Sequence, residues 1–260
     1  MKIVLIGAGN VAVHLGKALQ DAHHDILQVY SRTEASARWL AERLSCPYTT
    51  DLQALNTHAN VYIYALKDDV VKQVMQQVHI PRALHVHTAG SVPLYCPHEG
   101  DYGVIYPLQT FSKEREVDFS TIPICIDGNN EKSLLALTHL AESISKSTHL
   151  ISTDKRRQLH LAAIFACNFV NCLYANAAEL LETSNLPFKL LLPLIQETAA
   201  KVQTLTPRDA QTGPAKRADQ HVMEQHLSML SSSTQQEIYR LLSEDIHKRH
   251  TQPNPLDELR

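Results

Sequence analysis

The first residues whose types and spacing could do chemistry form a glycine-rich turn, Gly7-Ala8-Gly9-Asn10-Val11-Ala12. The apolar run 3–6 before it is typical of a strand buried on both faces, and Val11, Leu15 and Leu19 after it recur at helical spacing. A strand, a G-x-G-x-x-A turn and a helix in this order are the context that binds the pyrophosphate of a dinucleotide. The start of the chain therefore predicts a dinucleotide site.

Each small residue of the turn has its own role in that interpretation. Gly7 permits the tight turn, Gly9 has no Cβ to keep the pyrophosphate from the backbone, and Ala12 lets the helix pack closely on the strand. The free N–H groups and positive dipole end of the helix then face the phosphates. The alternative is an ordinary glycine turn. It is disfavoured because the chain has only 8 glycines in 260 residues, and two of them lie here, one residue apart.

The second expected strand, 26–30, ends in Ser31-Arg32-Thr33, where a dinucleotide protein selects its cofactor. An acidic residue here would bind the ribose 2′-hydroxyl of NAD, whereas an arginine accommodates the 2′-phosphate of NADP. Arg32 can bind phosphate in two places, and the hydroxyls of Ser31 and Thr33 lie beside it. The sequence thus favours NADP over NAD, and the alternative is a solvated loop with one arginine.

Two later strands also end in small or polar residues. The run 61–66 precedes Lys67-Asp68-Asp69, and the run 83–86 precedes His87-Thr88-Ala89-Gly90-Ser91. In a doubly wound sheet, ligands bind at the carboxyl ends of the strands, so these segments are expected to lie at the ligand-binding edge.

The alternation of strands and helices predicts the fold class. Helices are expected at 34–44 and 130–146, and two more lie between them, one that begins at Asp51 and one that ends at Val78. Further strands are expected near 48 and at 103–106, 122–126 and 148–151. Beyond Ser152 the periodicity is helical, with helices expected at 154–183, 187–205, 215–230 and 234–248 and a frayed tail at 251–260. We therefore predict an α/β fold: an N-terminal Rossmann domain (1–150) with a doubly wound, mostly parallel sheet, followed by an all-helical domain (151–260).

The first long helix of the second half carries a polar stripe of His160, Asn168 and Asn171, with Ile164 between them. On an α-helical wheel these residues lie on one face. One interpretation is a substrate and nicotinamide site in which His160 gives or takes a proton. The other is structural, with the polar groups paired to neighbouring helices or a dimer partner, and residue types alone favour it.

A second polar cluster spans 206–219 and contains Lys216 and Arg217 after Pro214, which suits the first turn of a helix. Either cation could bind a substrate carboxylate. The simpler interpretation is a loop before a helix with solvated charges.

Composition excludes several classes of function. The net charge of −3 argues against nucleic-acid binding, and the five scattered cysteines are typical of reduced thiols in a cytoplasmic protein. The fifteen histidines lack metal-ligand spacing, so no metal is expected. The apolar stretch 158–178 could mimic a membrane span, but its three asparagines favour a buried helix and no membrane association.

Five segments together resemble a family of bacterial Rossmann proteins: GAGNVA at the start, HTAGS at 87–91, YPLQTFS at 106–112, HLAAIFACNF at 160–169 and TGPAKRAD at 212–219. Its members carry a C-terminal helical domain of unknown function and are often labelled NADP oxidoreductases, some coenzyme F420-dependent. More distantly, the layout is similar to pyrroline-5-carboxylate reductase and to the β-hydroxyacid and ketopantoate dehydrogenases. Ala65-Leu66-Lys67 looks like the reductase's loop after its fourth strand.

The resemblance implies that the Rossmann domain holds NADP(H), that the helical domain forms a homodimer, and that a small-molecule substrate lies between the domains. The β-hydroxyacid dehydrogenases place a catalytic lysine four residues before an asparagine, but Ile164 stands at that position here. His160, one turn earlier, is the ionisable residue left on the stripe, so we expect His160 and Asn168 to be catalytic. The expected cofactor contacts are the turn 7–11, 31–33, 65–67 and 88–90, and the expected substrate contacts are Ser91, Asn171 and Arg217.

Two functions remain open at this point. The first is an NADP-dependent oxidoreductase that transfers a hydride to or from a small oxo, imino or hydroxy compound. The second is a non-catalytic NADP-binding regulatory or sensor protein, for which the missing lysine would be an argument.

Overall fold

A computed structural model describes residues 1–252, which form two compact units, Met1–Phe169 and the chain from Val170 onward. The units therefore divide within the long helix, nineteen residues beyond the boundary expected near 150. Most of the tail expected to be frayed lies outside the described residues.

Within residues 1–252, the first unit contains an eight-stranded sheet with the order β3-β2-β1-β4-β5-β6-β7-β8. Neighbouring strands are parallel except β6 and β7, so the predicted α/β fold with a mostly parallel sheet is confirmed. The antiparallel step follows from the connection 108–123, which holds only the 3₁₀ turn η2 (Phe119–Thr121) and no crossover helix. The strands are β1 (Lys2–Ile6), β2 (Asp25–Tyr30), β3 (Tyr48–Thr49), β4 (Val61–Tyr64), β5 (Leu84–His87), β6 (Asp101–Pro107), β7 (Ile124–Gly128) and β8 (Thr148–Leu150).

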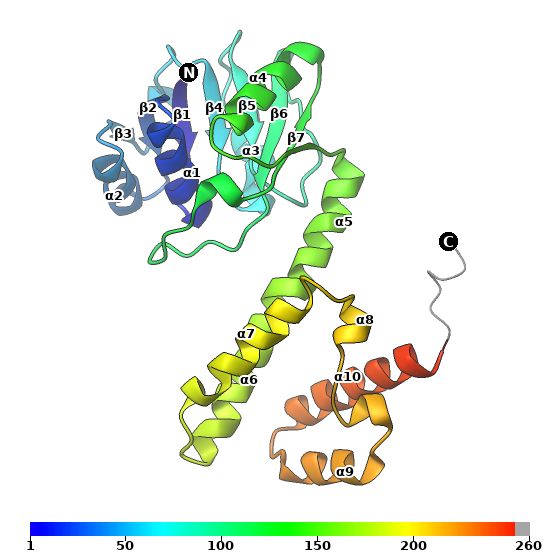
Figure 1. Cartoon of the computed structure of the whole chain (residues 1–260). Coiled ribbons are helices and arrows are strands. Elements are labelled where there is room, and N and C mark those ends of the chain that lie inside the picture. Colours follow the sequence, from blue (N-terminus) through cyan, green and yellow to red (C-terminus); the bar gives the residue numbers. More distant parts are fainter. Residues whose placement is uncertain (253–260) are drawn as a thin grey trace. The chain divides into compact units, whose positions relative to one another are not determined.

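Helices cover both faces of this sheet (Figure 1). Ile3 and Leu5 of β1 point into a core shared with α1 (Asn10–Asp21), α2 (Glu34–Arg43) and α4 (Glu131–Glu142). Val4 and Ile6 point the other way, into a core shared with α3 (Asp68–Gln77). Residues 3–6 of β1 are thus buried on one face or the other, which is why this run is continuously apolar after the exposed Lys2.

The helix expected from Asp51 is only the 3₁₀ turn η1 (Leu52–Ala54). Asp51 does cap it, accepting a hydrogen bond from the Gln53 N–H at 2.9 Å. Beyond this turn, Asn56 Oδ1 accepts from the His58 N–H at 2.9 Å, a local bond of the kind that competes with helix formation.

The second unit is helical, as expected. It contains α6 (Val170–Thr183), η4 (Phe188–Leu191), α7 (Leu192–Lys201), α8 (Pro207–Ala210), η5 (Ala215–Arg217), α9 (Gln220–Met229) and α10 (Ser233–Thr251). Two hydrogen bonds join α9 and its following turn to α10: His226 Nδ1 to Tyr239 Oη at 2.8 Å, and Gln236 Nε2 to the Leu230 carbonyl at 2.7 Å.

The long helix departs from the expected straight α-helix. It begins as α5 (Thr153–Ala163), continues as the π-helical segment η3 (Ile164–Phe169), and continues into α6. A π-helical turn contains more residues than an α-helical one, so an α-helical wheel does not describe the face from His160 to Asn171.

The expectation that 158–178 is buried is wrong for the single chain. Leu161, Phe165 and Phe169 recur every four residues and are 57%, 63% and 50% exposed. By length and composition alone, the helix Thr153–Thr183 of the described chain could cross a membrane. An uncovered apolar stripe of this kind usually marks a contact surface in a soluble protein.

Candidate dinucleotide and proton-transfer site

The glycine turn joins the ends of three strands. Gly7 has φ +126°, and its N–H donates to the Tyr30 carbonyl at the end of β2 at 2.8 Å. A Cβ on Gly7 would lie 2.2 Å from the Ala65 carbonyl oxygen, beyond β4. Both the backbone angle and the close approach therefore require glycine here.

Gly9 has the opposite surroundings. Apart from Gly9 and its two chain neighbours, no heavy atom of the part of the chain that the structure describes lies within 4 Å of a Cβ built on Gly9. Gly9 is also the N-cap of α1, whose described N-terminus has no side-chain cap and no acidic residue in its first turn. An open space in front of uncapped N–H groups fits the diphosphate of a dinucleotide.

Arg32 follows β2 and is exposed. Its guanidinium forms no hydrogen bond or ion pair with residues 1–252, whereas nearby Arg38 is paired with Glu34 at 2.8 Å and with the Tyr48 hydroxyl. Thr33 donates to the Ser36 hydroxyl at 2.9 Å. Of the two arginines near this turn, Arg32 is thus the one free to bind an additional phosphate.

The loop after β6, which the sequence did not predict to be part of the dinucleotide site, crosses the start of α1. Asn10 Nδ2 donates to the Phe111 carbonyl at 2.7 Å, and the His14 ring lies 2.9 Å from the Ser112 carbonyl through Nε2. Asn10 can therefore offer a ligand its backbone N–H while its amide holds this loop. The loop also reaches α2, where Lys113 lies 4.8 Å from the centre of the Trp39 ring.

His87 fixes the segment after β5. It is fully buried, its Nε2 donates to the Pro93 carbonyl at 3.1 Å, and its Nδ1 accepts from the Ala89 N–H at 3.2 Å. Burial, with a smaller contribution from the nearby Arg156 charge, lowers the pKa of His87 to about 4. The ring is therefore neutral at pH 7 and holds the backbone on both of its sides.

The start of α5 is anchored to the same segment. The Arg156 guanidinium is fully buried, and its Nη2 donates to the Val92 carbonyl at 2.6 Å, with Asp127 Oδ2 at 3.4 Å from Nη1. Arg157 Nε donates to the Ser91 carbonyl at 2.9 Å. These contacts explain why the first unit includes the beginning of the long helix.

His160 lies against Gly90 and Tyr106. Tyr106 Oη is 2.9 Å from His160 Nδ1, and a Cβ on Gly90 would lie 2.7 Å from that nitrogen and 2.8 Å from Tyr106 Cζ. Burial raises the pKa of Tyr106 to about 12, so its hydroxyl keeps its proton near pH 7. Oη has no other partner in the described residues, and when it donates to Nδ1 the ring nitrogen left for another partner is Nε2.

Several predicted site residues thus lie in one unit. His160 touches Gly90, the Ser91 hydroxyl bonds Asp68 after β4, and the Thr88 N–H donates to the Tyr64 carbonyl at 3.2 Å. Asn168 is exposed on η3. The role of every one of these residues in binding or catalysis stays a prediction.

Asn171 and Arg217 belong to the second unit, so their contact with the same substrate stays a prediction. The structure distinguishes Lys216 from Arg217, two cations that the sequence left equivalent as candidates for binding a substrate carboxylate. Lys216 Nζ donates to the Gln211 carbonyl at 2.8 Å, whereas the exposed guanidinium of Arg217 bonds no residue in the described range. The next residue, Ala218, has φ +55°, so the backbone around this motif is strongly bent.

Tyr106 was not predicted as a site residue. It lies in β6, and its partner His160 is 54 positions away, so no local pattern connects them. The one available signal was the segment YPLQTFS, which begins at this tyrosine and contributes to the family resemblance.

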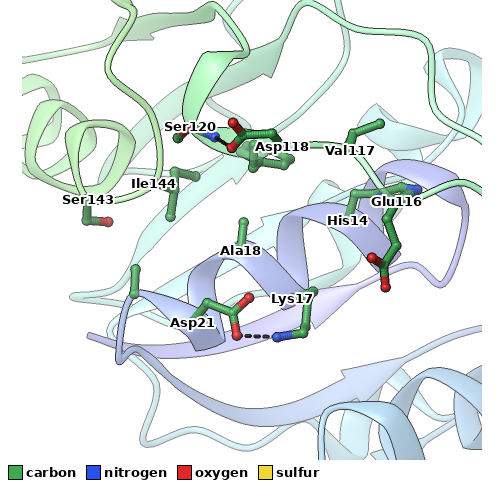
Figure 2. A pocket seen from close by; sticks show the side chains of 12 residues that line it. His14, Lys17, Ala18, Asp21, Glu116, Val117, Asp118, Ser120, Ser143 and Ile144 are labelled. Carbon is green, nitrogen blue, oxygen red and sulfur yellow. Dashed lines mark hydrogen bonds and ion pairs between the residues drawn. The ribbon is translucent and has the colours of Figure 1, made fainter.

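A pocket of about 580 Å³ lies elsewhere in the first unit, beside α1 (Figure 2). Its lining mixes Lys17, which pairs with Asp21, with Glu116 and Asp118, and it includes none of the predicted site residues. Nor do the described residues contain a group of three or more His, Cys, Asp or Glu that could hold a metal ion.

Two family models match the sequence in succession. Residues 2–88 match NADP oxidoreductase, coenzyme F420-dependent, and residues 122–246 match a domain of unknown function, DUF2520. No curated protein matches the chain in sequence.

Solved structures cover nearly the whole chain. A candidate NADP oxidoreductase from Bacteroides fragilis is 49% identical over 95% of this chain and 98% of that one, with a TM-score of 0.92. The 1-pyrroline-5-carboxylate reductase from Streptococcus pyogenes is 18% identical (95% and 98% covered, TM-score 0.65). A reductive aminase from Aspergillus terreus in complex with NADPH and ethyl-5-oxohexanoate is 14% identical (95% and 93% covered, TM-score 0.70). The last two show similarity of fold.

The buried His87 predicts how stability depends on pH. Its folded pKa of about 4 lies below the ordinary value of 6.5, so the unfolded chain binds the proton more tightly and stability falls as the pH falls between these values. From pH 7.5 to pH 5 we expect this residue to remove about 2 kcal/mol of unfolding free energy. In His87→Gln the unfolding free energy should depend less steeply on pH. It can be measured by urea unfolding at each pH, followed by the fluorescence of Trp39.

The matched control is His58→Gln, which changes an exposed histidine of the same unit. Burial also lowers the pKa values of His24 and His85, so a residual slope of the same sign should remain. If the unfolding free energy of His87→Gln depended on pH as steeply as that of the unmodified protein, His87 would not be a buried, neutral residue in the folded protein.

Proposed function

Since the chain belongs to the family of bacterial Rossmann NADP oxidoreductases with a C-terminal helical domain of unknown function, we propose that it transfers a hydride between NADP(H) and a small oxo, imino or hydroxy compound. NADP(H) is the cofactor, and the protein is an NADP-dependent oxidoreductase. The observation that carries the assignment to this site is Gly9, with open space at its Cβ position before the uncapped start of α1.

The residues of the glycine turn would hold the pyrophosphate, and Arg32 the 2′-phosphate. In this proposal 65–67 and 88–90 form the surface beneath the nicotinamide ring. NADPH supplies the hydride when bound. Open space at Gly9 and the unpaired Arg32 guanidinium support the first two roles.

His160 would supply the proton that must accompany hydride addition to a C=O or C=N bond. Its Nδ1 is occupied by the Tyr106 hydroxyl at 2.9 Å, and Gly90 lets both rings approach the segment after β5. This leaves Nε2 to face the substrate, as a proton donor needs. Asn168, which cannot titrate, would bind and orient the substrate.

The second candidate function is a non-catalytic NADP-binding regulatory or sensor protein. Ile164 at the position of the dehydrogenases' lysine favours it. The two are separated by following NADPH absorbance, first with a panel of oxo, imino and hydroxy compounds and then with F420. Oxidation of NADPH by any of them would support the enzyme.

We further infer a homodimer, formed by two copies of the helices within 152–250. The apolar stripe of Leu161, Phe165 and Phe169 supports this, since water-exposed stripes of that kind are rare on monomers. A cytoplasmic location is supported by the five cysteines, all of which are free.

The cofactor prediction concerns Arg32. Because the guanidinium would pair with the 2′-phosphate, which NADH lacks, Arg32→Ala should weaken NADPH binding about 10- to 100-fold and leave NADH binding nearly unchanged. Titration of intrinsic fluorescence or calorimetry measures both affinities. Equal affinity of the unmodified protein for NADPH and NADH would contradict the assignment.

The proton-transfer prediction concerns His160 and Tyr106. On an identified substrate, His160→Ala should lower kcat about 10²- to 10⁴-fold, because general acid catalysis typically contributes that much. Tyr106→Phe should lower it less, because it keeps the ring and removes only the bond to Nδ1. NADPH affinity should stay within about twofold in both. The control is His149→Ala, an exposed histidine of β8, and unaltered turnover in His160→Ala would refute the catalytic role.

The assembly prediction uses the exposed stripe. Leu161→Glu combined with Phe165→Glu should convert a dimer to a monomer at micromolar concentration, because two carboxylates would be buried in the contact. Light scattering measures the mass. Leu135→Glu, an exposed leucine of α4, is the matched control and should leave the dimer intact. A monomeric unmodified protein would contradict the prediction.

A further inference from the structure

Arg157 lies one helical turn before His160 on α5, and its side chain is exposed. Its Nε donates to the Ser91 carbonyl at 2.9 Å, which restricts the orientation of the planar guanidinium. The two terminal NH₂ groups bond none of the residues that the structure describes. Four N–H donors in a fixed plane are therefore left for something outside the chain.

The residues that hold this guanidinium also hold the predicted proton donor. Arg157 bonds Ser91, and the His160 ring lies against Gly90, the preceding residue. Residues three apart on a helix have Cβ atoms about 5–6 Å from each other. Arg157 Nε and the His160 ring thus contact neighbouring residues of a single short segment of backbone.

The local charges favour an anion at this point. Arg156 is buried behind the same segment, and its Nε is unpaired within residues 1–252. Of the nearby carboxylates, Asp127 faces Arg156 at 3.4 Å and Asp68 accepts the Ser91 hydroxyl. No carboxylate of the described chain lies within ion-pair distance of Arg157, so its charge is not neutralised.

We propose that Arg157 binds a carboxylate of the substrate, so that the substrate is an oxo or imino acid. This rests on the proposed function and names its substrate class. In the reduction the π bond of the C=O or C=N group breaks, its carbon gains the hydride as NADPH is oxidised, and its oxygen or nitrogen gains a proton through His160. The product is a hydroxy or amino acid, whose carboxylate stays on the Arg157 guanidinium throughout.

The experiment compares acids with their neutral esters on the NADP⁺ complex, in which no reduction occurs. The probes are pyruvate against methyl pyruvate, and 5-oxohexanoate against its ethyl ester, with affinities measured by ligand-observed NMR. The unmodified protein should bind at least one acid about tenfold or more tighter than its ester. Arg157→Gln should abolish that preference, and Arg157→Lys should retain part of it.

Two controls separate charge recognition from loss of structure. Arg82→Gln removes an exposed arginine at the opposite end of β5 and should keep the acid preference. NADP⁺ affinity and the melting temperature of Arg157→Gln should match those of the unmodified protein. Equal binding of acid and ester by the unmodified protein would overturn the proposal. An equal loss of acid and ester binding in Arg157→Gln would also overturn it, because it would mean that Arg157 only holds Ser91.

The experiment distinguishes a failure of this inference from a failure of the proposed function. If NADPH is never oxidised but the acid preference depends on Arg157, the hydride transfer fails and the carboxylate site stands. If NADPH reduces neutral carbonyl compounds and acids are not preferred, the enzyme stands and this inference fails.

Discussion

The first unit depends on one close approach, that of the segment 88–92 to the start of α5. The fully buried Arg156 guanidinium bonds the Val92 carbonyl at 2.6 Å, and Gly90 has no Cβ that would displace His160. Burying a guanidinium is costly, and the cost is offset here by the Val92 carbonyl and by Asp127. Once it is bonded, the helix can neither slide nor rotate without leaving that charge unpaired. The segment after β5 and the first turns of α5 therefore behave as one rigid support.

This support places two histidines in contrasting surroundings. His87 is fully buried and uses both ring nitrogens on backbone groups, and burial lowers its pKa to about 4, so it exchanges no proton near pH 7. His160 is half-buried, and Tyr106 occupies only its Nδ1. A proton donor needs one nitrogen that is oriented by the protein and another that reaches the substrate. Of the two, His160 has that arrangement, and His87 supplies the stiffness beneath it.

The sequence was informative where structure follows from neighbours along the chain. The turn at Gly7, the continuous apolar strand β1 and the helical second half are local patterns, and each is present. Patterns of this kind could not reveal contacts between distant residues: Tyr106 meets His160 across 54 positions, and Arg157 meets Ser91 across 66. The π-helical segment was missed because its side chains are compatible with an α-helix. The stretch 158–178 was wrongly expected to be buried in the single chain. Composition indicates that a surface is apolar, but it does not indicate what covers that surface.

The proposed chemistry needs a cofactor cradle, a proton donor and an anion site, and the residues proposed for all three lie between Gly7 and His160 in the first unit. The predicted contacts of the second unit, Asn171 and Arg217, are of types that do not exchange protons near neutral pH: an amide does not titrate, and a guanidinium stays charged. They can add affinity or orientation, but they cannot replace His160. In the proposed function the helical unit would add substrate contacts and pair two copies of the chain. This division of roles would let the helical unit vary to suit different substrates while the first unit kept the hydride and proton chemistry unchanged.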